Sequence, residues 1–196
     1  MSTLPAPVLD RRQAVPALIE RPRDFLVVGG LAGAAQELTA MTDDAPSVFG
    51  LAGAMGAAPM MGLGLALAQP KRRVLVVTGD GELLMNLGAL AAIAVQNPPN
   101  LAIICVDNGH YGETGNQDSH TGLGVALDVI ARGAGIPVVH TINTEAEMDE
   151  GRRLLREGGG LCFILLRVTE GPPLKIKRNL QPHVARDRFR AALLGG

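Results

Sequence analysis

RVLVVTGDGE (residues 73–82) and LAIICVDN (residues 101–108) decide the fold of this chain. The first stretch begins as a β-branched apolar run and ends in a turn with two glycines around an aspartate. Leucines and alanines then fill residues 82–96, which predicts a helix, and the two prolines within residues 97–100 end it. A strand, a helix and a second strand within about 35 residues predict two parallel strands joined by a right-handed crossover.

The same alternation continues on both sides of this unit. The other expected strands occupy residues 25–28, 48–49, 138–142 and 162–168. The other expected helices occupy residues 11–20, 34–39, 59–68, 125–133, 145–157 and 184–194. Because the strands are continuous apolar runs, we expect an α/β fold with a doubly wound, mainly parallel sheet and helices on both faces. We expect residues 1–196 to form a single domain with a short basic tail from about residue 175.

Composition excludes several classes of function. Hydrophobic residues make up 47% of the chain, enough for a packed core, and the net charge of −1 with 3% aromatic residues argues against a nucleic-acid partner. Cys105 and Cys162 lie within apolar runs, so we expect both to be reduced and buried, as in a cytoplasmic protein. Residues 52–68 are apolar but short for a membrane span and rich in glycine and alanine, which favours a buried helix and no membrane.

Ligands of such sheets bind at the carboxyl ends of the strands. Here those ends carry Gly29-Gly30, Gly79-Asp80-Gly81 and residues 108–112. The carboxylate of Asp80 and the amide oxygen of Asn108 are ligands that suit Mg²⁺, which also binds phosphate oxygens. A turn in which Asp80 only caps a helix is the alternative. The asparagine 28 positions later, after a helix and a strand, favours the metal site.

The order of strand, GDG, helix, strand and Asn resembles the thiamine-diphosphate (ThDP) binding motif. Residues 79–117 resemble the small subunits of sulfopyruvate decarboxylase and phosphonopyruvate decarboxylase in particular. Residues 51–68 resemble the upstream motif of the same family, a glycine-rich turn with Met-Gly followed by a helix. The resemblance implies a ThDP-binding fold, with ThDP and Mg²⁺ as cofactors.

The resemblance also implies roles for individual residues. Asp80 and Asn108 would bind Mg²⁺ through their side chains, and His110 through its backbone carbonyl. Met55 would hold the cofactor in its bent form, although an ordinary core methionine is the alternative. The implied cofactor-binding residues are Gly53, Ala54, Met55, Gly79, Asp80, Gly81, Glu82, Asn108, His110, Tyr111, Gly112 and Glu113.

The resemblance implies a second polypeptide. In this family the glutamate that activates the cofactor lies on a separate pyrimidine-binding domain, and this chain has room for the diphosphate-binding domain alone. We therefore expect a hetero-oligomer in which a partner subunit supplies that glutamate. The apolar residues 52–67 are a candidate contact surface, with a purely internal role as the alternative.

Two departures from the family bear on the substrate. The turn after the first strand reads Gly29-Gly30-Leu31-Ala32, where relatives carry a hydroxyl group, and Gln36 stands where an arginine is expected. Glutamine cannot pair with a sulfonate or phosphonate as arginine does. Either the substrate is a less anionic 2-oxo acid, or the partner supplies the cation.

The loop after Asn108 holds further polar residues. His110 and His120 are candidate catalytic residues that would donate a proton, and a polar surface loop is the alternative. Glu113 and Thr114 are expected to order this loop over the diphosphate.

These features together predict a lyase. We expect non-oxidative decarboxylation of a 2-oxo acid of the sulfopyruvate or phosphonopyruvate kind. A ThDP-dependent carboligase (synthase) subunit and a non-catalytic ThDP-binding regulatory subunit are the alternatives. A dinucleotide-binding protein is disfavoured because no G-x-G-x-x-G follows the first strand.

Overall fold

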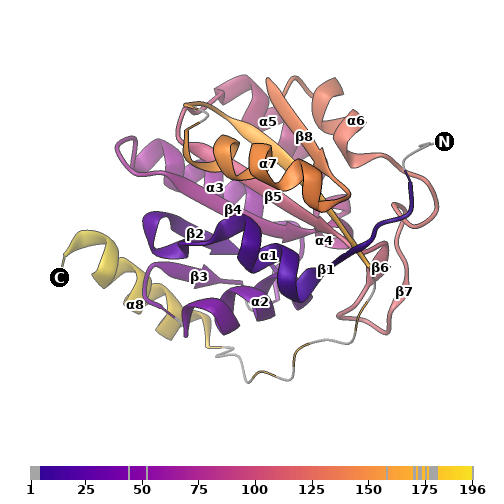
Figure 1. The fold of residues 1–196 in the computed structure, drawn as a ribbon. Helices are drawn as coiled ribbons and strands as arrows, with labels where there is room; N and C mark the ends of the chain where they lie inside the picture. Colours follow the sequence, from indigo (N-terminus) through magenta and orange to yellow (C-terminus); the bar gives the residue numbers. More distant parts are fainter. Residues whose placement is uncertain are drawn as a thin grey trace.

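A central parallel sheet organises the computed structural model, which describes residues 5–43, 45–51, 53–157, 159–169, 171, 174, 176 and 181–195 (Figure 1). Its order is β1-β9-β5-β4-β2-β3, with β8 also paired to β9, and every pair is parallel. The strands of this sheet are β1 (Leu9–Asp10), β2 (Leu26–Gly29), β3 (Val48–Gly50), β4 (Val74–Gly79), β5 (Leu101–Asp107), β8 (Val138–Ile142) and β9 (Cys162–Thr169). A separate antiparallel hairpin pairs β6 (His110–Tyr111) with β7 (Gln117–Asp118).

Helices cover both faces of the sheet, which confirms the expected α/β class. The helices are α1 (Arg11–Ile19), α2 (Ala32–Thr42), α3 (Ala58–Ala68), α4 (Asp80–Leu84), α5 (Gly88–Gln96), α6 (Leu127–Gly133), α7 (Met148–Arg156) and α8 (Pro182–Leu194), with 3-10 turns η1 (Pro22–Asp24) and η2 (Glu145–Glu147). Along β4, Leu75 and Val77 pack into the core with α1, α2 and α7, whereas Val74 and Val76 pack into the core with α3, α5 and α6. Alternate side chains of one strand thus fill two cores, as expected for a sheet buried on both sides.

Within the apolar segment, residues 58–68 form helix α3, which packs on the sheet. In α3, a Cβ at Gly62 would lie 2.1 Å from Val76 Cγ2, so this glycine lets the helix approach β4 closely. Within the part of the chain that the structure describes, no helix has the length and apolar character needed to cross a bilayer. Cys105 and Cys162 are both buried and unpaired, as expected.

The single helix expected over residues 82–96 is wrong, because the chain forms two helices there. Between α4 and α5, Met85 N donates to Glu82 O at 3.1 Å and Asn86 N donates to Leu83 O at 3.0 Å, a tighter turn than an α-helix. The Asn86 side chain donates to the Gly56 carbonyl at 3.2 Å. This contact holds the turn against the loop before α3, and it leaves α4 only five residues long.

The N-terminal strand β1 was not expected from the sequence. Its register, Leu9 against Val168 and Asp10 against Thr169, places it beside the carboxyl end of β9. The next helix, α1, therefore begins at the carboxyl edge of the sheet, where Asp10 accepts a hydrogen bond from Arg12 N at 2.8 Å.

The C-terminal helix lies where the sequence predicted one. Helix α8 packs beside β3, with the Phe189 and Phe49 ring centroids 5.8 Å apart. The expected start of the basic tail at residue 175, and residues 177–180, lie outside the described residues. The assignment of the whole chain to one domain stays a prediction.

Candidate functional site

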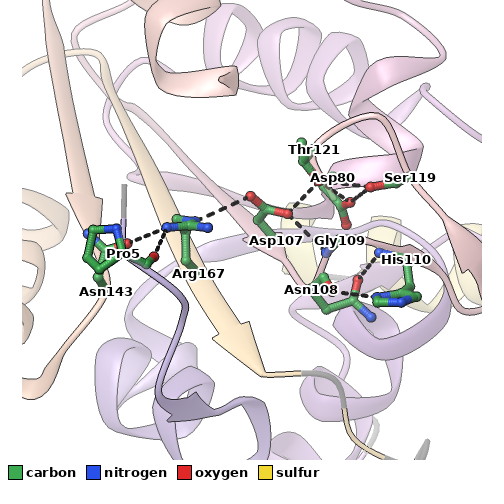
Figure 2. A network of polar contacts seen from close by, with 10 residues as sticks. All are labelled: Pro5, Asp80, Asp107, Asn108, Gly109, His110, Ser119, Thr121, Asn143 and Arg167. Carbon is green, nitrogen blue, oxygen red and sulfur yellow. Dashed lines mark hydrogen bonds and ion pairs between the residues drawn. The ribbon is translucent and has the colours of Figure 1, made fainter. Parts of the chain in front are cut away.

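The site forms where β4 and β5 end side by side. Asp80 follows β4 and is 1% exposed, and Asn108 follows the neighbouring strand β5. One carboxylate oxygen of Asp80 accepts hydrogen bonds from Ser119 Oγ at 2.5 Å and Thr121 Oγ1 at 2.8 Å (Figure 2). These two hydroxyl groups fix the carboxylate so that its other oxygen, Oδ1, faces Asn108.

Asp80, Asn108 and the backbone of His110 bring three polar groups together. One end of the Asn108 amide lies 3.0 Å from the His110 carbonyl oxygen and 3.2 Å from Asp80 Oδ1. With its NH₂ group at that end, the amide donates to both oxygens. With its oxygen there, the Asn108 oxygen is spaced from each of the other two oxygens like an adjacent ligand of an octahedral Mg²⁺, about 3.0 Å for Mg–O bonds of about 2.1 Å. The donor set therefore fits Mg²⁺, with the remaining positions available to phosphate and water.

Electrostatics favour a cation at the same place. Burial, and to a lesser degree the nearby charge of Asp107, raise the pKa of Asp80 to about 6 against the lowering effect of the hydrogen bonds from Ser119 and Thr121. Burial also raises the pKa of Asp107. The Thr121 hydroxyl lies 2.8 Å from Asp80 Oδ2 and 2.7 Å from Asp107 Oδ1, yet it carries a single proton to donate. A divalent cation would neutralise this pair of buried carboxylates.

A hydrogen-bonded chain ties this site to the N-terminal segment (Figure 2). Asp107 accepts from Gly109 N at 3.1 Å and lies 3.9 Å from Arg167 Nε. Arg167 in turn donates to Asn143 Oδ1 at 3.0 Å and to the Pro5 carbonyl at 2.6 Å. The segment before β1 is thereby fastened beside the carboxyl end of β5.

The side chain of Glu82 stabilises the turn before α2. It is 4% exposed, and its Oε2 accepts from Leu31 N at 3.0 Å and from Thr78 Oγ1 at 2.9 Å. A Cβ at Gly30 would lie 1.8 Å from Glu82 Oε2, so any side chain there would displace the carboxylate or the turn. Burial raises the pKa of Glu82. The Glu82 carboxylate therefore positions the start of α2. A contact between Glu82 and the diphosphate stays a prediction.

A cavity opens beside these groups. It is lined by the predicted cofactor residues Met55, Gly79, Asp80, Gly81, Glu82, Asn108, His110, Tyr111, Gly112 and Glu113. Of the predicted set, Gly53 and Ala54 are absent from the residues that line it. The cavity wall also includes residues that the sequence did not assign to cofactor binding, namely Arg11, Leu31, Ala32, Gly33, Ala34 and Val106.

The loop after Asn108 holds both candidate catalytic histidines. His110 Nδ1 lies 2.8 Å from the Asn108 carbonyl oxygen, and His110 Nε2 lies 3.2 Å from Asp118 Oδ1. His120 is exposed, and its Nδ1 lies 3.2 Å from the Tyr111 hydroxyl. The His110 ring is thus held by its own hairpin. The catalytic roles of His110 and His120 stay predictions.

Other residues of the loop shape its course. The Tyr111 ring covers Gly81, where an added Cβ would lie 2.5 Å from a ring carbon. Thr114 Oγ1 donates to Gln117 Oε1 at 3.2 Å, and Gln117 Nε2 donates to the Thr114 carbonyl at 3.2 Å. These bonds order the tip of the hairpin, as expected for Thr114.

Sequence reasoning missed Ser119, Thr121 and Arg11. The two hydroxyl residues lie two positions apart and reach Asp80 because Ser119 N donates to the Gly109 carbonyl at 2.8 Å, which folds the loop back. Arg11 reaches the cavity through the pairing of β1 with β9. A pair of hydroxyl residues soon after the motif was the available signal for the first two, and no local pattern pointed to Arg11.

Known proteins resemble this chain in sequence and fold. Residues 28–165 match the family described as "Thiamine pyrophosphate enzyme, C-terminal TPP binding domain". The chain is 39% identical over 148 residues to sulfopyruvate decarboxylase subunit beta of Methanocaldococcus jannaschii, which covers 70% of this chain and 77% of that protein. It is 36% identical over 176 residues to phosphonopyruvate decarboxylase of Streptomyces viridochromogenes, which covers 89% of this chain and 43% of that protein.

A solved structure supports the fold independently. Benzoylformate decarboxylase from Polynucleobacter necessarius superimposes with a TM-score of 0.64 at 19% identity, over 87% of this chain and 36% of that one. This chain therefore belongs to the thiamine pyrophosphate enzyme family and carries its C-terminal TPP-binding domain.

Proposed function

We propose that this chain is the diphosphate-binding subunit of a ThDP- and Mg²⁺-dependent enzyme that decarboxylates a 2-oxo acid without oxidation. The observation that carries the proposal is the position of the Asn108 amide, one end of which lies 3.2 Å from Asp80 Oδ1 and 3.0 Å from the His110 carbonyl oxygen. Similar proteins are named sulfopyruvate decarboxylase and phosphonopyruvate decarboxylase, which favours decarboxylation over a carboligase or a regulatory subunit.

In this proposal the residues of the chain hold and orient the cofactor. When bound, ThDP supplies the carbon centre that takes up the 2-oxo group and stabilises the charge left after CO₂ departs. Asp80, Asn108 and the His110 carbonyl hold Mg²⁺, and Mg²⁺ prefers to share its coordination with phosphate oxygens. Met55 lines the same cavity and sets the position of the cofactor ring.

The loop over the cavity has a second role in the proposal. Tyr111, Gly112 and Glu113 line the cavity and would limit the access of water to a bound cofactor. His120 is our candidate for holding the proton that the product receives. Its Nδ1 is engaged by the Tyr111 hydroxyl, so its Nε2 is the atom that would carry this proton.

We further propose that a second subunit with the pyrimidine-binding domain and the activating glutamate covers α3. This helix begins shortly after Met55 and exposes apolar side chains, with Met60 39%, Met61 38% and Leu67 52% exposed. Met85 is 57% exposed and lies in the turn between α4 and α5. The next residue, Asn86, fastens this turn to the loop before α3 by donating to the Gly56 carbonyl. Such a patch is typical of a protein interface. The name "subunit beta" of one relative supports a second polypeptide.

The proposed substrate is a 2-oxo acid with a second acidic group, of the sulfopyruvate or phosphonopyruvate kind. The names of the relatives support this class. Gln36 carries no charge, so the partner subunit supplies the cation for that acidic group. We place the enzyme in the cytoplasm, which two buried, unpaired cysteines support.

A reconstituted enzyme tests this function. The chain is purified with its second subunit, supplied with ThDP and Mg²⁺, and assayed for CO₂ and aldehyde on sulfopyruvate, phosphonopyruvate and pyruvate. Asp80→Ala should abolish release of both products, while Asp149→Ala, at an exposed position on α7, should leave it unchanged. Condensation products in place of aldehyde would instead identify a carboligase, and no turnover on any 2-oxo acid would contradict the proposal.

A further inference from the structure

Arg11 is a buried cation at the edge of the cofactor cavity. It is the first residue of α1, is 8% exposed and lines the same cavity as Asp80 and Asn108. Its Nε donates to Glu37 Oε1 at 3.2 Å, and Glu37 on α2 is 2% exposed. Among the residues that the structure describes, neither Nη group of Arg11 has a hydrogen-bond partner. Because Arg11 lines the cavity, these four N–H donors are available to an acceptor bound there.

The Arg11 guanidinium lies against the first turn of α2. A Cβ at Gly33 would lie 2.5 Å from Arg11 Nη1, so the absence of a side chain at Gly33 makes room for it. Helix α2 has 11 residues, and its N-cap residue Leu31 offers no side-chain hydrogen bond. The N–H groups of its first turn are therefore left to an outside acceptor, and Ala32, Gly33 and Ala34 line the cavity. The Arg11 guanidinium and the first turn of α2 therefore line the same part of the cavity.

The position of Arg11 along the cavity identifies the group it meets. Arg11 lines both the cavity that includes Met55 and an adjoining one that shares Asn108 and Gly112 with it. Met55 is absent from the described wall of the second cavity. If the ring of ThDP rests on Met55 and Mg²⁺ lies at Asp80, Arg11 is at the phosphate end, away from the ring.

The surrounding sequence explains why a cation is needed there. The turn at residues 29–35 reads GGLAGAA and contains no hydroxyl side chain that would donate to a phosphate. Helix α4, with five residues, contributes a weaker dipole than a full-length helix. The buried carboxylates of Asp80 and Asp107 offset the charge of a bound Mg²⁺.

We propose that Arg11, oriented by Glu37, binds the terminal phosphate group of ThDP through its Nη groups and the first turn of α2. A planar guanidinium with two adjacent N–H donors matches two oxygens of one phosphate. Arg11 thereby sets the preference for the diphosphate over the monophosphate of thiamine. This inference rests on the proposed function, because it takes ThDP to be the ligand of the cavity.

The test compares binding of two thiamine phosphates by calorimetry. Arg11→Gln alone leaves the Glu37 carboxylate buried without its ion pair, so the double variant Arg11→Gln/Glu37→Gln is used, and thermal unfolding establishes that it folds. In the assembled enzyme with Mg²⁺, its affinity for ThDP should fall about 10- to 100-fold. Its affinity for thiamine monophosphate should change little, so the discrimination between the two falls. Arg12→Gln, exposed on the same helix, is the matched control.

Binding of inorganic pyrophosphate with Mg²⁺ to the full chain gives a second readout that needs no partner. Arg11→Gln/Glu37→Gln should weaken it, and Asp80→Ala should abolish it. Loss in Asp80→Ala with unchanged affinity in the Arg11 double variant would overturn the role of Arg11 and leave the proposed function standing. Unchanged binding in Asp80→Ala would instead contradict the metal site. Unchanged ThDP affinity with a raised KM for the 2-oxo acid would assign Arg11 to the substrate and overturn the inference.

Discussion

The Thr121 hydroxyl lies 2.8 Å from Asp80 Oδ2, and this contact joins a loop residue to the carboxylate at the end of β4 across 41 positions of sequence. The same hydroxyl lies 2.7 Å from Asp107 Oδ1. The hydroxyl group thus lies between two buried carboxylates that repel each other, and its proton can be shared with either of them. Thr121 orients the predicted metal ligand without belonging to the ligand set.

Thr121→Val should therefore weaken Mg²⁺ binding while preserving the shape of the site. Residues that orient a metal ligand typically contribute about 10- to 100-fold in affinity. We expect a loss of this size in Mg²⁺-dependent ThDP binding, measured by calorimetry on the assembled enzyme. Thr39→Val, which removes a hydroxyl bonded to the Ala35 carbonyl within α2, should leave the affinity unchanged. Equal affinities in all three proteins would show that Thr121 has no part in orienting Asp80.

The pKa of Asp80, raised to about 6 mainly by burial, predicts a pH dependence of stability in the metal-free chain. The pKa of this carboxyl group in the unfolded chain is near 3.8, so the folded chain binds the proton more tightly. Its contribution to stability is complete below pH 3.8 and is lost as the pH rises through 6. Asp107, whose pKa is also raised, acts in the same direction.

Thermal unfolding of the metal-free chain at several pH values measures this effect. The melting temperature of Asp80→Asn should depend less on pH between 4 and 7 than that of the unmodified chain. Saturating Mg²⁺ should reverse the trend, because the metal binds the deprotonated carboxylate and competes with the proton. A melting temperature that rises from pH 4 to 7 through the Asp80 carboxyl group would contradict this assignment.

The elements that the sequence predicted well are long and locally determined. Strands β5 and β8 have the expected bounds, residues 101–107 and 138–142, because each is rich in apolar or β-branched residues and is bounded by prolines or polar turn residues. The strand ends fix Asp80 and Asn108, so the core of the candidate site could be predicted as well. A parallel sheet brings the ends of neighbouring strands together whatever the side chains between them.

The missed features depend on contacts between distant segments. Strand β1 has two residues, too few for any periodic pattern, and its pairing with β9 carries Arg11 to the cavity. The break between α4 and α5 depends on the bond from Asn86 to the Gly56 carbonyl. Thr121 reaches Asp80 because Gly109 and Gly122 let the loop pass close to itself, where a Cβ at Gly122 would lie 2.6 Å from Gly109 O. Apart from the pair of hydroxyl residues at positions 119 and 121, these contacts leave no local signature.

The close approach of Gly30 to Glu82 predicts a severe effect of one added methyl group. Gly30→Ala would place its Cβ 1.8 Å from Glu82 Oε2, so the carboxylate must leave Leu31 N or the turn must shift. We expect a loss of about 1 to 3 kcal/mol in the free energy of unfolding, the usual cost of overpacking. Denaturant unfolding measures this loss.

Gly64→Ala provides the matched control for that measurement. Gly64 lies on the exposed side of α3, and an added Cβ there would meet nothing within 4 Å. Alanine is the better helix former, so this variant should gain about 0.5 to 1 kcal/mol. Similar losses in both variants would show that the approach of Glu82 to Gly30 does not limit the turn.

If the second subunit covers the exposed apolar side of α3, a charged substitution there should prevent assembly. Leu67→Glu replaces a side chain that is 52% exposed, so the fold of the chain should keep its melting temperature within a few degrees. A charge buried at an interface without a partner weakens binding by about 2 to 5 kcal/mol, so the complex should dissociate at micromolar concentration. Sedimentation of the mixed subunits measures this dissociation. Leu194→Glu on α8, an apolar position that is 64% exposed, is the control and should assemble normally. Normal assembly of Leu67→Glu would place the partner elsewhere on the surface, because a subunit seated over Leu67 would bury the new carboxylate without an ion-pair partner.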